Sequence, residues 1–365
     1  AGRLFDLTSL QREANRQFRY SASRTLKLAQ SLYEKHKSIT YPRTDSKALP
    51  EDYVETCIDN LQKLPGNLKP HAEKVLGNNW VDGNNRRIFN DKQISDHFAI
   101  IPTDQSPQGL NDSEQRIYDM IAKRFVAAFY PPAQWDVTTR KSLIGDHLFK
   151  TEGRVLVEPS WLAIYGKDQQ GEDLLPALTD ADQEKAKVLE TNLVPEETKP
   201  PAHYTEATLL AAMENAGKLV EDEELADAMK EKGLGTPATR ASTIEHLINE
   251  KYLHREKGKL SSTNKGEELC EFLQTVGVDI LTSPGMTGEW EYKLRQIENG
   301  DLSRDQFMRD ILELTKSVVQ RTVGFKESEA DLRETGLSSP IDGSPLFEGL
   351  AYYQTKAGDF RIGKS

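Results

Sequence analysis

The chain has 365 residues, 37% hydrophobic and 29% charged, with a formal net charge of −11. This length exceeds one compact core, so we expect two or three domains, and the composition excludes a disordered protein. No stretch resembles a bilayer span or a signal peptide, which predicts a cytoplasmic protein without a membrane partner. Only Cys57 and Cys270 are present, which excludes a disulfide framework.

The first 130 residues are predicted to be mainly helical. Residues 7–36 have the apolar spacing of two helices, the first capped by Ser9 and the second by Ser21 or Ser23. Extended backbone should follow at residues 38–46, because a residue before proline avoids the helical region.

Further helices are expected at residues 51–75 and 112–129, the second ending at a double proline. From residue 135 to 165 the sequence changes to short runs of alternating apolar and polar residues, which are typical of strands. These runs are 135–144, 147–157 and 161–166. Residues 171–201 are polar, acidic and proline-bearing, which indicates a connection.

A third unit is expected after this connection. Thr205 should cap a helix that stops at Gly217, and Pro237 suits the first turn of another helix. Residues 236–269 then read as helix, strand, turn, strand and helix, the order of a winged-helix module that binds DNA. The tail beyond Val323 is rich in Ser, Gly, Pro and Glu and ends in short strand-like runs near residues 350–360.

Local charge differs from the net charge. Residues 1–44 contain nine cations (Arg3, Arg12, Arg16, Arg19, Arg24, Lys27, Lys35, Lys37 and Arg43) and three anions (Asp6, Glu13 and Glu34), an excess of six positive charges. A basic patch of this kind suits a nucleic-acid backbone, although it is also compatible with the solvated face of two helices.

The segment 38–46, SITYPRTDS, contains a candidate nucleophile. A tyrosine can attack phosphorus and form a phosphotyrosine bond that conserves the energy of the broken phosphodiester. Arg43 lies two residues after Tyr41, within reach of the same phosphate in an extended segment, and Thr44, Asp45 and Ser46 can orient it.

The sequence resembles the type IA DNA topoisomerases, most closely the bacterial topoisomerase III branch. The resemblance rests on five motifs in the family's order, at residues 7–18 (LTSLQREANRQF), 38–46, 94–103 (ISDHFAIIPT), 198–217 (TKPPAHYTEATLLAAMENAG) and 233–242 (GLGTPATRAS). It implies that the chain forms part of a ring around DNA.

The resemblance also implies roles for single residues. Tyr41 would attack single-stranded DNA to make a 5′-phosphotyrosine bond, Arg43 would grip the phosphate, and His97 would donate a hydrogen bond or move a proton. DNA contacts are expected from Thr44, Asp45, Ser46, Arg12, Thr239 and Arg240. His97 could equally be a structural histidine.

In the family, Mg²⁺ is held by a Toprim domain before the point where this chain starts, at Ala1. We therefore expect a fragment that binds no metal itself, is inactive alone and needs that domain as a partner, with a helicase as a further candidate partner. Asp180 and Asp182 have the spacing of the family's metal motif, but they follow a polar connection and are better explained as solvated acids.

Near the C-terminus, residues 339–343 (SPIDG) resemble the family's zinc ribbon with both cysteines replaced, so no zinc is expected. The predicted fold is multidomain and mainly α with a β-rich middle. Its parts are a tyrosine domain at 1–130, an arch segment at 131–198, a winged-helix-like domain at 199–322 and a degenerate tail at 323–365. The alternatives are a non-enzymatic winged-helix DNA-binding module, which leaves SITYPRTDS unexplained, and a tyrosine recombinase, whose tyrosine should lie near the other end.

Overall fold

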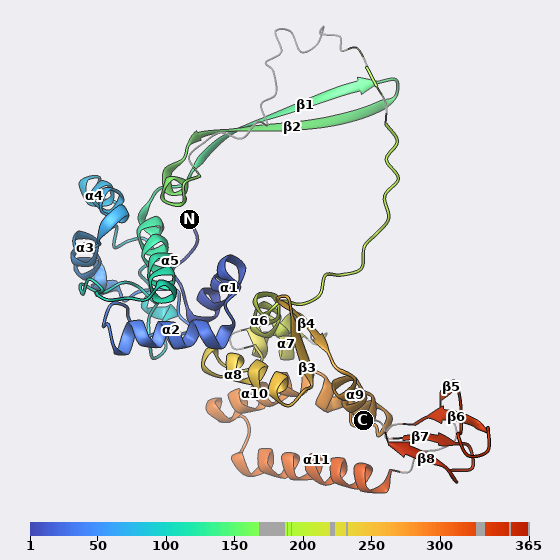
Figure 1. Cartoon of the computed structure of the whole chain (residues 1–365). Coiled ribbons are helices and arrows are strands. Elements are labelled where there is room, and N and C mark those ends of the chain that lie inside the picture. The colour runs from blue at the N-terminus through green and yellow to red at the C-terminus, as the bar shows by residue number, and fades with distance from the viewer. Residues whose placement is uncertain are drawn as a thin grey trace. The chain divides into compact units, whose positions relative to one another are not determined.

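The computed structural model describes residues 1–167, 187, 189–190, 192–219, 223–230, 233–325, 333–349 and 352–363. It separates the chain into two compact units, Ala1–Ala202 and His203–Ser365, which are described in turn (Figure 1). Within the described ranges most regular structure is helical, as expected. No helix of these ranges has the length and apolar character to cross a membrane.

The first unit begins with α1 (Leu7–Phe18) and α2 (Ala22–Glu34). Ser21 caps α2, as predicted, and its hydroxyl accepts from the Arg24 N–H at 3.1 Å. The prediction that Ser9 caps α1 is wrong. Asp6 is the cap, and Ser9 is the third residue of a reciprocal capping box in which its N–H donates to Asp6 Oδ1 at 2.7 Å.

Five more helical segments precede the longest helix of this unit. Residues 51–77, expected as one helix through residue 75, are divided by Pro65 and Gly66, because proline lacks an N–H and Gly66 has φ +63°. The segments are η1 (Glu51–Tyr53), α3 (Val54–Gln62), η2 (Gly66–Leu68) and α4 (Lys69–Gly77), followed later by η3 (Asp91–Gln93).

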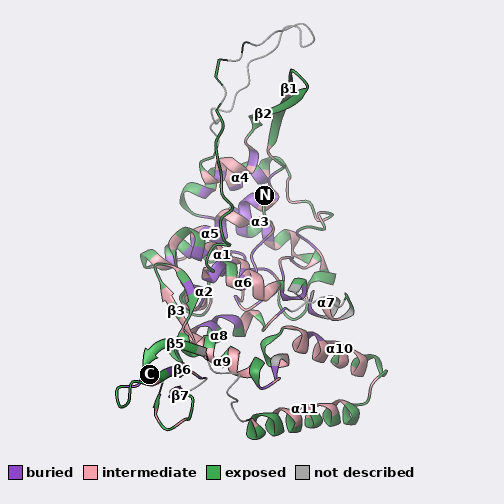
Figure 2. Ribbon diagram, turned by 90° about the vertical axis from the view of Figure 1, so that its right-hand side faces the viewer, coloured by how far each residue is buried: buried purple, intermediate pink, exposed green. Residues whose placement is uncertain are grey.

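Helix α5 (Asp112–Phe129) forms the centre of this unit's core and has the predicted bounds. Its apolar face is buried, with Ile117, Ile121 and Phe125 at 0% exposure, against the strand-like segment 98–102 and the first two helices. Most of the buried residues of this unit lie in this helical body (Figure 2).

A long hairpin follows, formed by β1 (Gln134–Ile144) and β2 (His147–Glu158) with Ile144 opposite His147. Its apolar side chains are largely exposed, including Leu143 at 72% (Figure 2). The third predicted strand, at 161–166, is wrong: it is a 3-10 helix, η4 (Ser160–Tyr165). Ser160 has φ +46°, which ends the strand, and Ile164 turns back into the core.

The second unit is mainly helical, and Thr205 and Pro237 start helices as predicted. The predicted stop at Gly217 is wrong, because α6 ends at Glu214. Gly217 instead permits a close approach, since a Cβ there would lie 2.7 Å from the Ala226 carbonyl oxygen. The elements are α6 (Glu206–Glu214), η5 (Ala216–Leu219), α7 (Glu223–Lys230), α8 (Pro237–Asn249), β3 (Leu253–Glu256), β4 (Lys259–Ser262), α9 (Asn264–Thr275), η6 (Asp279–Thr282), α10 (Gly285–Asn299) and α11 (Arg304–Gly324).

The predicted order of helix, strand, turn, strand and helix is present as α8, β3, β4 and α9. A four-stranded antiparallel sheet ends the chain, in the order β5 (Arg333–Ser338), β6 (Pro345–Glu348), β7 (Tyr352–Thr355) and β8 (Arg361–Gly363). In the turn between β5 and β6 the Ser344 hydroxyl donates to Asp342 Oδ1 at 2.8 Å. Asp342 belongs to the zinc-ribbon-like segment 339–343.

Asp6 should stabilise the first unit through its capping role. Asp6→Ala removes the acceptor for Ser9 N–H and the partner of Lys47 Nζ, 3.3 Å away, and we expect it to lower the free energy of unfolding by about 1–2 kcal/mol. Asp6→Asn keeps the cap and should lose less. Urea unfolding followed by circular dichroism measures both, and equal losses would contradict a capping role.

Candidate active site around Tyr41

The tyrosine segment, defined as residues 38–46, is extended, as predicted, and lies against residues 97–103. Ile39 forms an antiparallel bridge with Pro102. The Thr40 N–H donates to the Ile101 carbonyl at 3.0 Å, and its hydroxyl donates to the Ala99 carbonyl at 2.9 Å. These contacts fix the backbone on one side of Tyr41.

On the other side of Tyr41, Thr44 and Ser46 are both 3% exposed. The Thr44 hydroxyl donates to the His97 carbonyl at 2.9 Å and accepts from the Ser46 N–H at 3.0 Å. The Thr44 carbonyl accepts from the Leu7 N–H at 3.0 Å, and so satisfies one of the donors that the start of α1 leaves free. Thr44 and Ser46 therefore hold the segment in place, whereas Asp45 between them is exposed.

The ring of Tyr41 lies between two other rings. Its centroid is 4.4 Å from that of His97 and 5.4 Å from that of Tyr33, which meets it edge-on at 77°. Tyr41 is half-buried and His97 is exposed. Within the described ranges, no hydrogen bond engages the Tyr41 hydroxyl, so it can meet a ligand at the surface.

Arg43 is half-buried and is oriented by α2. With the Gln30 amide turned so that its oxygen faces the guanidinium, that oxygen accepts from Arg43 Nε at 3.3 Å and Nη2 at 3.0 Å. Among the described residues no carboxylate pairs with Arg43, so its positive charge is available to an anion. The structure thus brings Tyr41, Arg43 and His97 together.

Three residues of this site were not singled out from the sequence. Gln30, Tyr33 and Lys37 lie on α2 and the turn after it, at spacings of three and four, and Lys37 Nζ lies 5.6 Å from the Tyr33 ring centroid. Such spacing places side chains on one helix face. This spacing could have indicated these three residues from the sequence, because the helix face that they form directly precedes the tyrosine segment.

The end of α2 is anchored from behind by Glu114 of α5. Glu114 Oε1 accepts from the Ser31 hydroxyl at 2.6 Å, and Oε2 lies 3.6 Å from His36 Nε2, with both side chains of this pair under 10% exposed. These donors, first Ser31 and then the Asn111 N–H, hold the pKa of the Glu114 carboxyl below its ordinary value.

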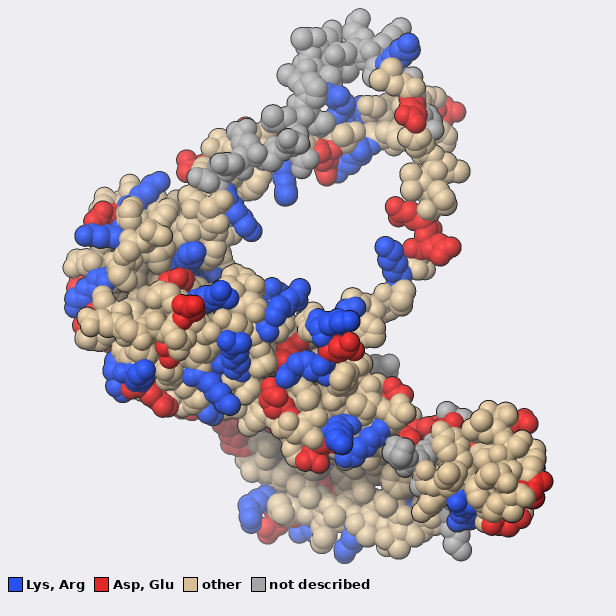
Figure 3. Space-filling model, in the orientation of Figure 1, with Lys and Arg blue, Asp and Glu red and all other residues tan. Residues whose placement is uncertain are grey.

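The remaining predicted contacts are dispersed. Arg12 lies half-buried on α1. Figure 3 shows Lys and Arg side chains over the region of α1 and α2. In the second unit the Thr239 hydroxyl belongs to the capping box of α8, and Arg240 is 4% exposed and donates from Nε to the Leu234 carbonyl at 3.0 Å. In this conformation the buried Arg240 side chain stabilises the loop before α8, and its contact with DNA stays a prediction.

The fold is that of a DNA topoisomerase, and the chain, which carries the tyrosine, arginine and histidine just described, belongs to that family. The family model described as DNA topoisomerase matches residues 1–309. The similarity places the chain among the type IA enzymes, in the topoisomerase III branch.

The relatives support this placement at moderate identity. The chain is 37% identical to a DNA topoisomerase 3 of Bacillus cereus over 366 residues and 39% identical to that of Bacillus licheniformis over 360 residues. Each match covers 94% of this chain and 48% of the relative, so the chain spans about half the length of the curated relatives it matches. Full-length topoisomerase I from Thermotoga maritima has the same fold, with a TM-score of 0.63, 22% identity, and coverage of 99% of this chain and 57% of that one.

Acid should weaken the contribution of Glu114 to folding. Because its pKa is lower in the folded chain, its stabilising effect is complete above the unfolded value of about 4.5 and is lost as pH falls through the folded value. The unfolding free-energy difference between the wild type and Glu114→Gln should therefore shrink as the pH falls below about 4.5. The exposed Glu34→Gln variant is the control for charge, and a difference independent of pH would contradict the assignment.

Proposed function

We propose that Tyr41 is the nucleophile of a type IA topoisomerase that cuts one DNA strand, allows passage of another through the gap and reseals the first. The observation that supports this most is the grouping of Tyr41, Arg43 and His97 on a segment fixed on both sides of the tyrosine. Family membership supports the same reaction, and single-stranded DNA in the cytoplasm is the substrate we propose.

The cleavage step conserves bond energy. The Tyr41 oxygen forms a bond to phosphorus, the bond from phosphorus to the 3′ oxygen breaks, and the proton lost by the tyrosine is balanced by protonation of the departing 3′ oxygen, which becomes a 3′ hydroxyl. The 5′ phosphate remains on Tyr41. Attack by the 3′ hydroxyl reverses these changes, so resealing needs no ATP.

Arg43 and His97 would assist this exchange in different ways. The Arg43 guanidinium would hold the phosphate and offset charge that develops on its oxygens. His97 would donate a hydrogen bond to the phosphate or carry the proton. The Thr44 bond to the His97 carbonyl supports this role, because it fixes the histidine backbone relative to Tyr41.

Gln30 and Tyr33 act as positioning residues in this proposal. Gln30 sets the orientation of the guanidinium, and the edge of Tyr33 restricts the Tyr41 ring. Neither needs to touch the phosphate. Their effect on rate should come from geometry, since misplaced reacting groups slow a reaction steeply.

We propose a role for Mg²⁺ in the complete enzyme but not in this chain alone. In the described ranges no group of three or more His, Cys, Asp and Glu residues could hold a metal ion. Asp180 and Asp182 lie outside the described residues. We propose that a Toprim domain supplies Mg²⁺ as a partner of this chain and that a helicase delivers single strands.

The second unit would bind the same DNA. The α8–β3–β4–α9 order supports a winged-helix module, and Thr236 and Thr239 at the start of α8 support a phosphate contact there. We further propose that the two units form part of the family's ring.

Covalent trapping tests the nucleophile. We expect labelled single-stranded oligonucleotide and Mg²⁺ to leave label on the denatured complete enzyme, none on its Tyr41→Phe variant, and none on this chain alone. Tyr204→Phe changes an exposed tyrosine, 52% accessible, and should retain the label. No label on any protein, with duplex binding intact, would favour a non-enzymatic DNA-binding module.

Substitutions around the guanidinium separate catalysis from positioning. In the complete enzyme, Arg43→Ala should slow cleavage about 100-fold to 1,000-fold, because it removes a group that stabilises the transition state. Gln30→Ala should slow it about tenfold, with oligonucleotide affinity nearly unchanged. Gln17→Ala on α1 is the matched control, since that side chain is exposed and bonds to Glu13. A normal rate for Gln30→Ala would refute positioning.

A further inference from the structure

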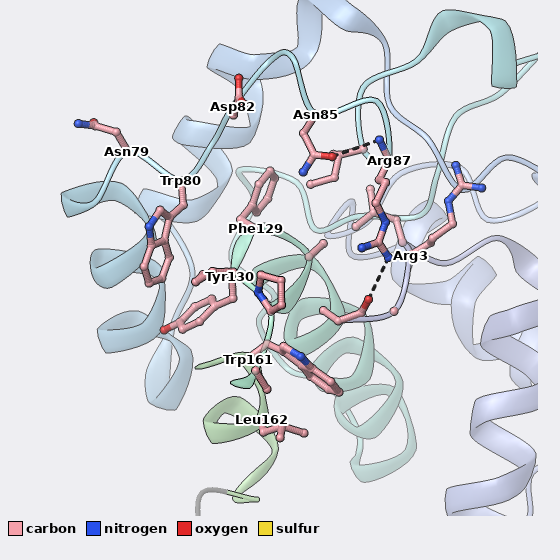
Figure 4. Close-up of a pocket in the computed structure, with 18 of the residues that line it drawn as sticks. Arg3, Asn79, Trp80, Asp82, Asn85, Arg87, Phe129, Tyr130, Trp161 and Leu162 are labelled. Carbon is pink, nitrogen blue, oxygen red and sulfur yellow. Dashed lines mark hydrogen bonds between the residues drawn. The ribbon is translucent and has the colours of Figure 1, made fainter. Parts of the chain in front are cut away.

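The first unit contains a large cavity away from the Tyr41 site. It has a volume of about 670 Å³ and lies where the N-terminal residues, the loop after α4, the end of α5, the base of the β1–β2 hairpin and η4 meet (Figure 4). The volume is in the range of small-molecule sites. None of Tyr41, Arg43 and His97 lines it.

The cavity is cationic. Arg3, Arg87 and Arg154 contribute to its lining, and none of them forms an ion pair within the described ranges. Arg87 Nη2 donates to the Ala1 carbonyl at 3.2 Å and Arg3 Nη2 donates to the Gln93 side-chain oxygen, so both guanidinium groups are held by neutral acceptors and their charges stay uncompensated. The single acid of the lining, Asp82, accepts instead from the Asn84 N–H at 2.9 Å.

The cavity is also aromatic. Trp80, Trp135 and Trp161 line it, three of the four tryptophans in the chain. Tyr130 meets Trp80 edge-on with the centroids 4.8 Å apart, and the Arg154 guanidinium lies 5.0 Å from the Trp135 ring. Trp135 is 41% exposed, so one indole remains accessible at the mouth.

We propose that this cavity binds a nucleotide of single-stranded DNA at a second site, separate from the strand at Tyr41. Guanidinium groups recognise phosphate bidentately, and indole faces stack on any base. Both chemistries are present in one cavity without a competing ion pair. An acidic peptide would use the arginines alone and leave the tryptophans unexplained. The proposal rests on the proposed function only in taking DNA as the substrate.

The position of the cavity gives the bound strand a mechanical effect. Trp135 and Arg154 belong to the hairpin, whereas Tyr130 and Arg87 belong to the helical body. A nucleotide held by both would fix the base of the hairpin on α5. Strand binding should therefore protect the hairpin base, around Pro131 and Pro132, from proteolysis.

Tryptophan fluorescence tests the site directly, because quenching by stacked bases reports on the cavity. The experiment uses this chain carrying Trp290→Phe, which leaves the three cavity tryptophans, titrated with a thymidine oligonucleotide. We expect the oligonucleotide to quench the fluorescence of this protein. The double variant Arg87→Gln/Arg154→Gln should bind at least tenfold more weakly, and the salt dependence of its binding should fall by about one to two phosphate contacts. Arg86→Gln is the matched control, since Arg86 pairs with Glu51 outside the cavity.

Three results of these experiments would contradict the second binding site. No quenching, equal binding by the double variant and the Arg86→Gln control, or equal quenching by polyglutamate would overturn the second site. Tyr41→Phe should quench normally. If covalent trapping succeeds while cavity binding fails, the proposed function stands without this site, whereas quenching without trapping would separate binding from cleavage.

Discussion

The geometry of the candidate site depends on one constraint, the pinning of an extended segment at Thr40 and Thr44. Thr40 bonds to the 99–101 backbone on one side of Tyr41, and Thr44 bonds to the His97 carbonyl on the other. Because residues of an extended chain alternate in direction, fixing these two threonines inward leaves Tyr41 and Arg43 to face the site. The Thr44 carbonyl of the same segment also accepts a hydrogen bond from the Leu7 N–H, so the segment positions the start of α1 as well.

Charge is arranged locally in a way that the net value of −11 conceals. Arg43 is held by an amide rather than by a carboxylate, so its orientation is fixed while its charge stays available. The arginines of the cavity are likewise held by neutral groups. Elsewhere, exposed pairs such as Lys63 with Asp104 neutralise each other and contribute little to stability. An acidic protein can therefore offer cationic sites to a phosphate backbone without a basic composition.

Two of the wrong predictions from the sequence share a cause. Residues 161–166 have the composition of a strand, but no strand of the described residues pairs with them, and burying Ile164 in the core favours a turn of helix. Glycine often ends a helix, but Gly217 instead allows the backbone at Ala226 to approach closely. Ser9 is a good cap in isolation, but Asp6 takes that position. For residues 161–166 and Gly217 the deciding interaction comes from another element of the fold, whereas Asp6 belongs to the same local capping motif as Ser9.

The sequence alone determined the elements with strong periodicity or capping, such as α5, the β1–β2 hairpin and the helix starts at Thr205 and Pro237, because these depend on local backbone preferences. It also determined the family, through motifs whose order along the chain carries the information. Only the tertiary structure decided that α2 orients Arg43 and Tyr41, and that three tryptophans meet three arginines in one cavity. Those contacts join different elements of the fold, and packing of the whole unit sets their distances.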